Sequence, residues 1–329
     1  MISPPAMTQP IRTRPCPGCH LCGTMGEVLY TNLTDRLFNA PGVWQIKRCP
    51  QGGCGLLWLD PMPAEEDLHL IYQNYFTHQD KPLAARGFAR GAGHGAYRAL
   101  LRVTGLTHQR DELFSLHLRG IKPGRLLDVG CGDGGRLARW QSMGWEVEGQ
   151  EVDAVAAERA RSLHGLHVHL GALSDLALPG STFDVVTMSH VIEHVPDPTA
   201  LLQECRHILK PDGRLIAVTP NVNSFGHHQF GSDWMWLDPP RHLHLFSPTT
   251  LGQLAARAAF RFPRTWTTAA NAQFLAEGSL CIKRTGRHRF GARMGLWTLI
   301  QSLLFQFHAL AVHLARKDSG EECVLNAVK

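Results

Sequence analysis

The sequence predicts an α/β fold: a doubly wound, mostly parallel sheet with a small N-terminal module and helical additions. Three observations lead to this expectation. Strand-like and helix-like segments alternate after Gly124, a glycine-rich turn follows the first of these strands, and five of the nine cysteines lie within the first 54 residues. Nearly continuous apolar strands separated by helices are typical of a sheet covered on both faces. With 329 residues, 44% of them hydrophobic, the chain can form one such core and a smaller unit.

The alternating segments set the expected organisation of the chain. RLLDVG, EVEGQEVD, VHLGAL, FDVVTMSHV and RLIAVTP have the composition of strands, and the segments between them have helical spacing. We expect a disordered tail at 1–15, a cysteine-bearing module at 16–63, a helical connector or lid at 64–120, the core at 121–282, a helical insertion at 283–318 and a final core strand at 319–329.

Charge and the N-terminal residues bound the class of protein. The formal net charge is +5, but the 33 basic and 28 acidic residues are mixed along the chain, so nucleic acid is not indicated as a partner. The first fifteen residues lack the apolar stretch of a secretory signal, so we expect a reducing, cytoplasmic location. Cysteines are then expected as metal ligands or packed thiols before disulfides.

The segment Leu126–Gly135, LLDVGCGDGG, is the expected cofactor-binding turn. In a doubly wound sheet, ligands bind beyond the carboxyl ends of the strands, where the first strand turns into its helix. Gly130, Gly132 and Gly134 let the backbone approach a ligand that a Cβ would obstruct. The glycines alone do not separate a methyl donor from a nicotinamide, because Gly130, Gly132 and Gly135 also satisfy GxGxxG.

Two carboxylates change this balance. Asp128 lies in the strand, two residues before the first glycine, where a charge is costly unless it accepts hydrogen bonds from the turn or from a cationic ligand. Glu151 ends the second strand, where its two oxygens can accept from the two ribose hydroxyls of either cofactor. Asp128 favours the methyl donor, whose amino group and sulfonium are positive where a dinucleotide has a negative pyrophosphate.

Together, LLDVGCGDG, the acid in GQEVD, FDVVTMSHVIEHVPDP and LKPDGRLIAVTPN resemble the class I S-adenosylmethionine-dependent methyltransferases, the branch that includes ubiquinone-type and sugar-modifying enzymes. The match spans about Gly124 to Phe260 and implies a Rossmann-like methyltransferase sheet. The resemblance implies that Asp128 and the glycine turn hold the amino-acid part of S-adenosylmethionine. It also implies that Glu151 holds the ribose and that Ala172 and Leu173 flank the adenine. The acidic residue that the family often has after its third strand is absent here.

Four cysteines in two pairs predict a structural zinc site. Cys19 and Cys22 form the first pair, Cys49 and Cys54 form the second, and a glycine follows each pair. Four soft thiolates favour tetrahedral zinc in a closed site with no open catalytic position. Cys16 is the alternative member of the first pair, and metal-free packed thiols are the other interpretation. The module resembles the zinc-binding domain that precedes the methyltransferase domain in bacterial sugar methyltransferases and in some ribosomal RNA guanine methyltransferases.

Histidines after the fourth and fifth strands are the candidates for catalysis. Methyl transfer to a hydroxyl or a carbon acid requires a held acceptor and removal of a proton, and histidine suits the second task because its pKa is near neutrality. His242 is the first candidate for the base, because WMWLDPPRHLHLFSPTTL resembles the YHEHxSYFS segment of zinc-domain sugar C-methyltransferases. His190 and His194 are next. Pro240 and Arg241 replace part of that motif, so C-methylation is not established by it.

Further residues are assigned to the acceptor side with less support from any motif. Asn221 and Arg241 are expected to orient an acceptor. Trp234 and Trp236 are expected either to form a sugar-stacking wall or to pack in the core.

The apolar segment 294–317 predicts a long helix or a helical hairpin. Polar residues interrupt it too often for a confident transmembrane span. We expect it to pack on the domain or on a homodimer partner, with peripheral contact at the inner face of a membrane as the alternative.

The leading hypothesis is O- or C-methylation of a small molecule, namely a sugar, a polysaccharide precursor or a lipid-linked intermediate. One alternative is an RNA methyltransferase whose zinc module binds the substrate through Arg36, Lys47 and Arg48. The others are a non-catalytic, zinc-scaffolded assembly or regulatory protein and a nicotinamide-dependent oxidoreductase.

Overall fold

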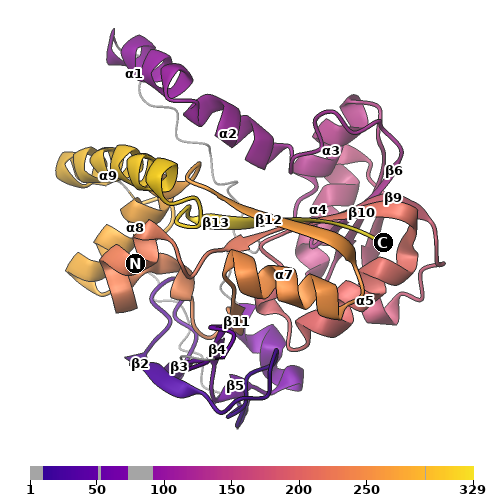
Figure 1. Ribbon diagram of the computed structural model, residues 1–329, viewed down its shortest axis with the longest axis horizontal. Coiled ribbons are helices and arrows are strands. Elements are labelled where there is room, and N and C mark those ends of the chain that lie inside the picture. The colour runs from indigo at the N-terminus through magenta and orange to yellow at the C-terminus, as the bar shows by residue number, and fades with distance from the viewer. Residues whose placement is uncertain (1–9, 51–52, 73–91, 293) are drawn as a thin grey trace.

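The computed structural model describes residues 10–50, 53–72, 92–292 and 294–329. Its centre is a seven-stranded sheet in the order β12-β13-β10-β9-β6-β7-β8 (Figure 1). β8, β7, β6, β9 and β10 pair in parallel, and β13 runs antiparallel between β10 and β12. This confirms the predicted α/β class. The strands are β6 (Arg125–Val129), β7 (Glu146–Glu151), β8 (Val168–Leu170), β9 (Phe183–Ser189), β10 (Leu209–Pro220), β12 (Arg261–Thr268) and β13 (Glu322–Val328).

Helices cover both faces of this sheet, as the apolar strands predict. Successive strand residues point to opposite faces. Leu126 of β6 packs in the cluster that contains Trp140, while its neighbour Leu127 packs in the cluster that contains Leu202. The helices on the first face are α3 (Gly135–Ser142) and α4 (Ala154–His164), and those on the second are α5 (Pro198–Ile208) and α7 (Pro248–Arg257) (Figure 1).

Capping side chains fix where three of these helices begin. Asp153 accepts from Val155 N at the start of α4, and Asp197 accepts from Ala200 N at the start of α5. Ser247 forms a capping box at the start of α7. Each cap satisfies backbone N–H groups that have no partner within the helix. The loops that lead into α4 and α5 are thereby held at the carboxyl edge of the sheet.

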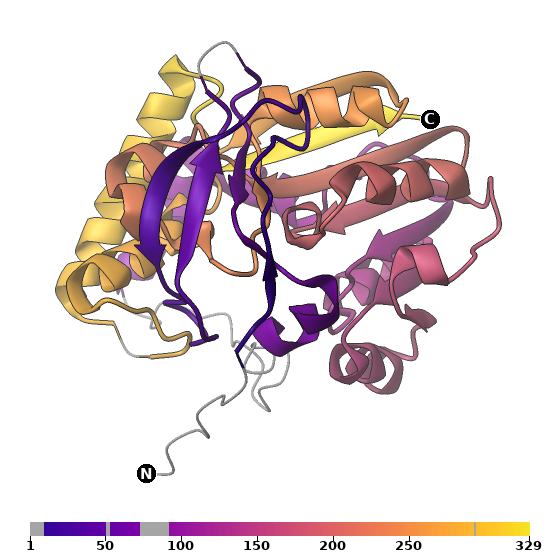
Figure 2. The ribbon, with the colours of Figure 1, turned by 90° about the horizontal axis from the view of Figure 1, so that it is seen from below.

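The N-terminal module shares a sheet with the core (Figure 2). The order is β11-β4-β3-β2. β2, β3 and β4 belong to the module, whereas β11 comes from the core and places His244 opposite Trp58. The predicted boundary at residue 63 therefore does not separate two independently packed units. The strands are β2 (Glu27–Leu33), β3 (Trp44–Arg48), β4 (Leu57–Leu59) and β11 (His244–Leu245).

The tail predicted to be disordered is ordered in part. Strand β1 (Thr13–Arg14) pairs with β5 (Met62–Pro63), and the side chain of Arg12 donates to Asp67 at 2.7 Å. Backbone pairing and this ion pair hold residues 12–14, although the composition of the tail, with its prolines and arginines, suggests disorder. Residues 1–9 lie outside the described residues.

The helical additions lie around the core. The insertion predicted to begin at 283 begins earlier, because α8 crosses that boundary, and the apolar segment 294–317 forms one helix, α9, and not a hairpin. Residues 73–91 of the predicted lid lie outside the described residues. The additional helices are α1 (Ala92–Val103), α2 (Leu106–Phe114), α6 (Phe225–Phe230), α8 (Ala272–Thr285), α9 (Leu296–Ala315) and the 3-10 helices η1 (Glu65–Tyr72), η3 (Leu173–Asp175), η4 (Ile192–His194), η5 (Gly231–Asp233) and η6 (Met235–Leu237).

Candidate cofactor and acceptor site

The glycine-rich turn leaves β6 at the carboxyl edge of the sheet. Gly130, Gly132 and Gly134 have φ angles of 68°, 59° and 77°, which L side chains rarely adopt. A Cβ at Gly130 would lie 2.5 Å from Val191 Cγ2, and a Cβ at Gly134 would lie 2.6 Å from Leu166 Cδ1. The space in front of Gly132 is open within 4 Å. Packing therefore explains Gly130 and Gly134, while Gly132 has the open approach predicted for a ligand.

Glu151 holds this turn from the neighbouring strand. It is 8% exposed at the end of β7, where its Oε2 accepts from Gly132 N at 2.8 Å. Its Oε1 accepts from Val152 N at 2.8 Å and from Asp153 N at 3.0 Å. A carboxylate has about four lone-pair sites. Glu151 therefore fixes the turn against the start of α4 and keeps capacity for a ligand hydroxyl.

Asp128 is buried in β6, the strand that pairs with β7. Its Oδ1 accepts from the Thr187 hydroxyl at 2.6 Å, because β6 and β9 place the two residues opposite each other. The expected donors from the turn are therefore replaced by a side chain of the next strand. Burial raises the pKa of Asp128 to about 6, although Arg136 opposes this. A cationic ligand group beside Asp128 would favour its charged form.

The residues predicted to flank adenine differ in exposure. Both follow β8, where the Gly171 carbonyl accepts from the side chain of Gln150. Ala172 is exposed, whereas Leu173 is 6% exposed and packs in the main core cluster. Ala172 is therefore the one of the two that is open to a ligand.

His190 lies at the end of β9 between two carboxylates. Its Nδ1 is 3.1 Å from Glu193 Oε1, and its Nε2 is 3.0 Å from Glu322 Oε1. Burial lowers the pKa of His190, but the hydrogen bonds to both carboxylates outweigh burial and raise it to about 10. His190 is therefore an imidazolium at neutral pH and cannot accept a proton there.

His194 and His242 have the opposite state. Nδ1 of His194 is 3.1 Å from Arg241 O, and Nδ1 of His242 is 2.8 Å from Trp236 O. A carbonyl only accepts, so each Nδ1 carries the proton and each Nε2 keeps a lone pair. Burial lowers the pKa of both histidines to about 4, so both are neutral at pH 7. Their ring centroids are 4.7 Å apart.

Glu193 joins these two histidines in one cluster. Its carboxylate is fully buried, and one donor atom from each of Glu193, His194 and His242 lies within 4.8 Å of the others. Such a group can pass a proton or hold a divalent cation. Glu193 also accepts from the Thr219 hydroxyl at 2.9 Å.

Sequence reasoning missed three of the residues around this cluster. Tyr72, at the end of η1, places its hydroxyl 3.1 Å from His194 Nδ1, and burial raises its pKa. No motif surrounds Tyr72. Glu193 stands three residues after His190, a spacing that brings side chains together in a helical turn and could have signalled the pair. Glu322 is 132 residues away from His190, and no local pattern indicates it.

The residues predicted to orient an acceptor are structural instead. Arg241 is fully buried and pairs with Asp35 at 2.8 Å and with Asp238 at 2.5 Å. The Asn221 amide donates to two backbone carbonyls of the segment before β13. Trp234 and Trp236 are 1% and 8% exposed, so they belong to the core and not to a sugar-stacking wall.

The four predicted cysteine ligands meet in the N-terminal module. Their sulfur atoms all lie within 4.8 Å of one another, with Cys19–Cys54 and Cys22–Cys49 separations of 3.4 Å. A tetrahedral zinc ion with bonds of about 2.3 Å places its sulfurs about 3.8 Å apart. The donor set and its dimensions therefore fit such an ion. Cys16 is outside this cluster; its backbone N donates to Asp60 at 2.6 Å.

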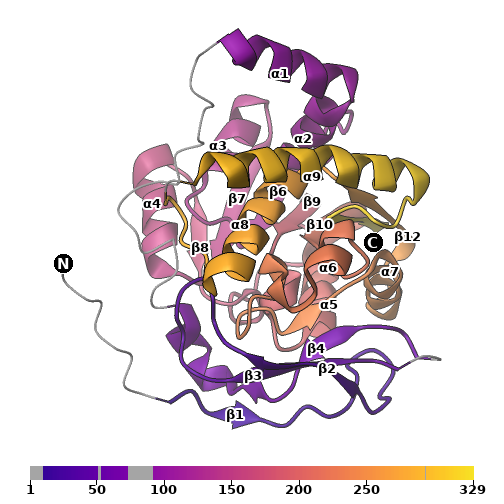
Figure 3. The same ribbon diagram turned by 90° about the vertical axis from the view of Figure 1, so that its left-hand side faces the viewer.

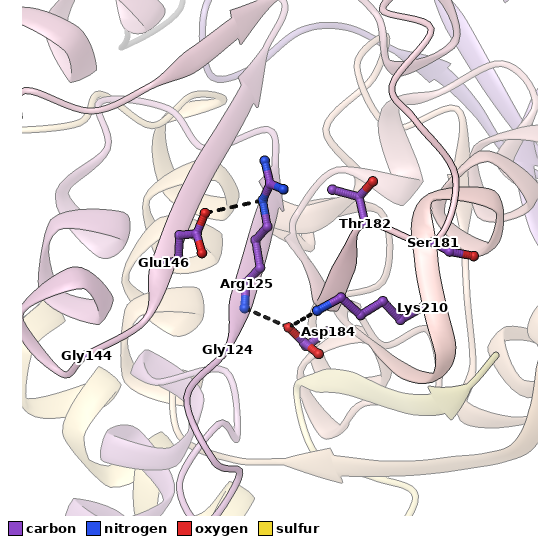
Figure 4. Close-up of a pocket in the computed structure, with 8 residues that line it drawn as sticks. All are labelled: Gly124, Arg125, Gly144, Glu146, Ser181, Thr182, Asp184 and Lys210. Carbon is purple, nitrogen blue, oxygen red and sulfur yellow. Dashed lines mark hydrogen bonds and ion pairs between the residues drawn. The ribbon is translucent and has the colours of Figure 1, made fainter.

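A separate cavity lies at the other edge of the sheet (Figure 4). It has a volume of about 630 Å³ and is lined by residues at the amino ends of the strands. Asp184 accepts from Lys210 at 2.8 Å and from Arg125 N at 2.8 Å, and Arg125 also pairs with Glu146 at 3.5 Å. Ligands of doubly wound sheets bind at the carboxyl ends. Its position and its internally paired charges separate this cavity from the candidate site.

The known proteins that this chain matches are methyltransferases. Residues 102–262 match the family model described as "Methyltransferase domain". A ubiquinone biosynthesis O-methyltransferase of Cereibacter sphaeroides is 35% identical over 173 residues, which cover 45% of this chain and 67% of the relative. One from Xanthomonas euvesicatoria is 40% identical over 104 residues, which cover 30% of this chain and 43% of the relative. The crystal structure of a SAM dependent methyltransferase from Archaeoglobus fulgidus has a TM-score of 0.46 and 18% identity, and covers 71% of this chain and 99% of that one.

Proposed function

Because the chain belongs to the S-adenosylmethionine-dependent methyltransferases, we propose that it methylates a hydroxyl oxygen of a small molecule and uses the His194–His242 pair to remove the proton. The observation that carries this proposal is the pair of neutral histidines with unprotonated Nε2 atoms. His194 follows β9, the strand that pairs with β6, and His242 lies between β10 and β11. Val191, next to His190, contacts the turn at Gly130.

The cofactor fits the carboxyl edge of β6 and β7. S-adenosylmethionine supplies a methyl group on a positive sulfonium. The open face of Gly132 admits its amino-acid part, and the buried Asp128 carboxylate compensates positive charge. Glu151 would accept from a ribose hydroxyl while it holds the turn. The exposed Ala172 would lie beside the adenine.

The proton path follows from the state of each histidine. A hydroxyl acceptor must lose its proton as the new bond forms. Nε2 of His242 accepts it, because the Nδ1–H of His242 is held by the Trp236 carbonyl. His194 is the second neutral imidazole of the pair, with its Nδ1–H held by the Arg241 carbonyl. His190 stays charged and positions Glu193, whose negative charge stabilises a protonated neighbouring histidine.

Two observations favour an oxygen as the atom that receives the methyl group. The relatives are named O-methyltransferases, which favours oxygen over carbon. The departure from the C-methyltransferase motif at Pro240 and Arg241 points the same way. A sugar, a polysaccharide precursor and a lipid-linked intermediate are the hydroxyl-bearing classes to test.

We assign the four cysteines to structural zinc. The cluster offers no open position for chemistry, so the ion would stabilise the module against the core. Purified protein is expected to contain one zinc per chain, and Cys49→Ala is expected to lose it, as measured by plasma mass spectrometry. Zinc-free protein with unchanged thermal stability would contradict this role.

The structure removes the support for an RNA substrate that the sequence offered. Arg36 pairs with Asp233 at 2.7 Å, and Lys47 pairs with Asp60 at 2.6 Å. Arg48 lies 3.9 Å from Glu27. Basic residues engaged in this way offer little to phosphates.

Calorimetry followed by a transfer assay tests the proposal. Titration is expected to show binding of S-adenosylhomocysteine and none of NADH. Labelled methyl groups are then expected to reach members of a hydroxyl-acceptor panel, with the product identified by mass spectrometry. Absence of S-adenosylhomocysteine binding would refute the cofactor assignment. Labelled product methylated only at carbon would refute the oxygen assignment.

A further inference from the structure

Helix α9 turns most of its polar side chains inward and several of its large apolar side chains outward. In a globular protein, the apolar face of a helix normally packs on the core. Here five exposed side chains form a surface that we call the apolar stripe. They are Leu296, Trp297, Ile300, Leu304 and Leu314, which are 73%, 63%, 39%, 64% and 61% exposed.

Hydrogen bonds of the inward face hold the helix in this orientation. Gln306 is fully buried; its Nε2 donates to Ala269 O at 2.8 Å, and its Oε1 accepts from Gln273 N at 3.0 Å. Thr298 accepts from the guanidinium of Arg284 at 2.7 Å. Rotation of α9 to bury the stripe would leave these buried polar groups without partners, at a cost for each group.

Basic residues flank α9 in the sequence. Four exposed basic side chains precede it, and two follow it. Arg316 approaches Asp318 at 3.9 Å. The basic residues are Lys283, Arg284, Arg287, Arg289, Arg316 and Lys317.

Helix α9 lies at the surface of the described part of the molecule. α9 runs along the outer surface, on the side away from β2 and β3 (Figures 1 and 3). α1 packs beside it through Leu101 and Leu310 and adds the exposed Leu100 and Val103. By length and composition, α9 is the one helix in the described part of the chain that could cross a membrane.

We propose that the apolar stripe docks into the interface of an anionic phospholipid bilayer, with α9 parallel to the membrane surface. An apolar stripe that includes an exposed tryptophan, on a helix flanked in sequence by basic residues, fits that environment. The inward hydrogen bonds keep one face of α9 on the protein, so the helix lies in the interface and does not span the bilayer. A second copy related by two-fold symmetry would bring like charges together at the stripe.

Vesicle co-sedimentation with the full chain tests this docking. We expect the protein to bind vesicles of equal parts phosphatidylcholine and phosphatidylglycerol, more weakly as salt is raised, and to bind phosphatidylcholine alone poorly. Leu304→Glu is expected to weaken binding by at least about tenfold, the change for loss of one buried leucine side chain. Leu163→Glu is the matched control, because Leu163 is 69% exposed on α4.

Two results would overturn the proposal. One is vesicle binding that is absent or that Leu304→Glu and Leu163→Glu affect equally. The other is a wild-type dimer in sedimentation velocity that Leu304→Glu converts to monomer without any vesicle binding, which would assign the stripe to a second copy. S-adenosylhomocysteine affinity, measured on each variant, reports whether the fold and the cofactor site are intact and separates failure of docking from failure of the proposed function.

Discussion

Arg241 offers the sharpest test of how the N-terminal module and the candidate site depend on each other. Its guanidinium donates to Asp35 in the module, to Asp238 in its own loop and to the Ile71 carbonyl beside Tyr72. Its own carbonyl is the partner of His194 Nδ1. All of its side chain is buried.

Arg241→Met keeps most of the volume and removes the charge, which leaves two carboxylates buried without their cation. Breaking a buried ion pair in this way costs about 3–5 kcal/mol of unfolding free energy. At about 2 °C per kcal/mol for a chain of this size, the melting temperature is expected to fall by about 6–10 °C. Arg287→Met is the control, because Arg287 is exposed.

Denaturant and thermal unfolding, followed by circular dichroism, measure the effect. The deficit of Arg241→Met is expected to shrink as pH falls from 8 to 5, because burial already raises the pKa of Asp238 to about 6 and protonation removes its uncompensated charge. A loss below about 1 kcal/mol, the usual limit for a surface pair, or a deficit that is independent of pH, would refute this account of the network.

Three further predictions concern the site. Glu151→Ala should weaken S-adenosylhomocysteine binding by about ten- to a hundredfold in calorimetry, because one charge-assisted hydrogen bond to the ribose is lost together with the bond that holds the turn at Gly132; unchanged affinity would remove its ribose role. His242→Ala should lower kcat by about a hundredfold while the exposed His228→Ala leaves kcat unchanged; equal rates for both variants would exclude His242 as the base. The hydrogen bonds that raise the pKa of His190 to about 10 stabilise the fold fully below its unfolded pKa of about 6.5, and this stability is lost as pH rises through 10. His190→Gln should therefore flatten the decline of melting temperature over that range, and an unchanged slope would contradict the pairing.

The parts of the fold that local pattern determines could be predicted from sequence. The alternation of strands with helices and the glycines of a tight turn depend on residues that are close together in the chain. The parallel sheet and the turn at Gly130–Gly134 can therefore be recognised from the sequence alone. The cysteine pairs can be recognised for the same reason. The glycine after each pair has a positive φ, at Gly23 and Gly55. The four sulfurs cluster without Cys16, which supports the choice of Cys19.

The parts that depend on distant partners could not be predicted. No residue near Arg241 in the sequence indicates that its charge is paired with the module, because its partner Asp35 is 206 residues away. The charge state of His190 depends on Glu322, and that of His242 depends on burial, neither of which leaves a local pattern. The apolar composition of α9 indicated burial, but its interspersed polar residues are the ones that face the core.

The shared strand pair β4–β11 has a consequence for biosynthesis. His244 and Leu245 complete a sheet whose other three strands leave the ribosome first. Until those residues emerge, the outer edge of β4 has unpaired backbone groups that can pair with another chain. The four cysteines that we assign to zinc are synthesised early, but the module can close only after most of the central sheet has been synthesised. Nascent chains stalled before residue 244 are therefore the ones that need a chaperone most.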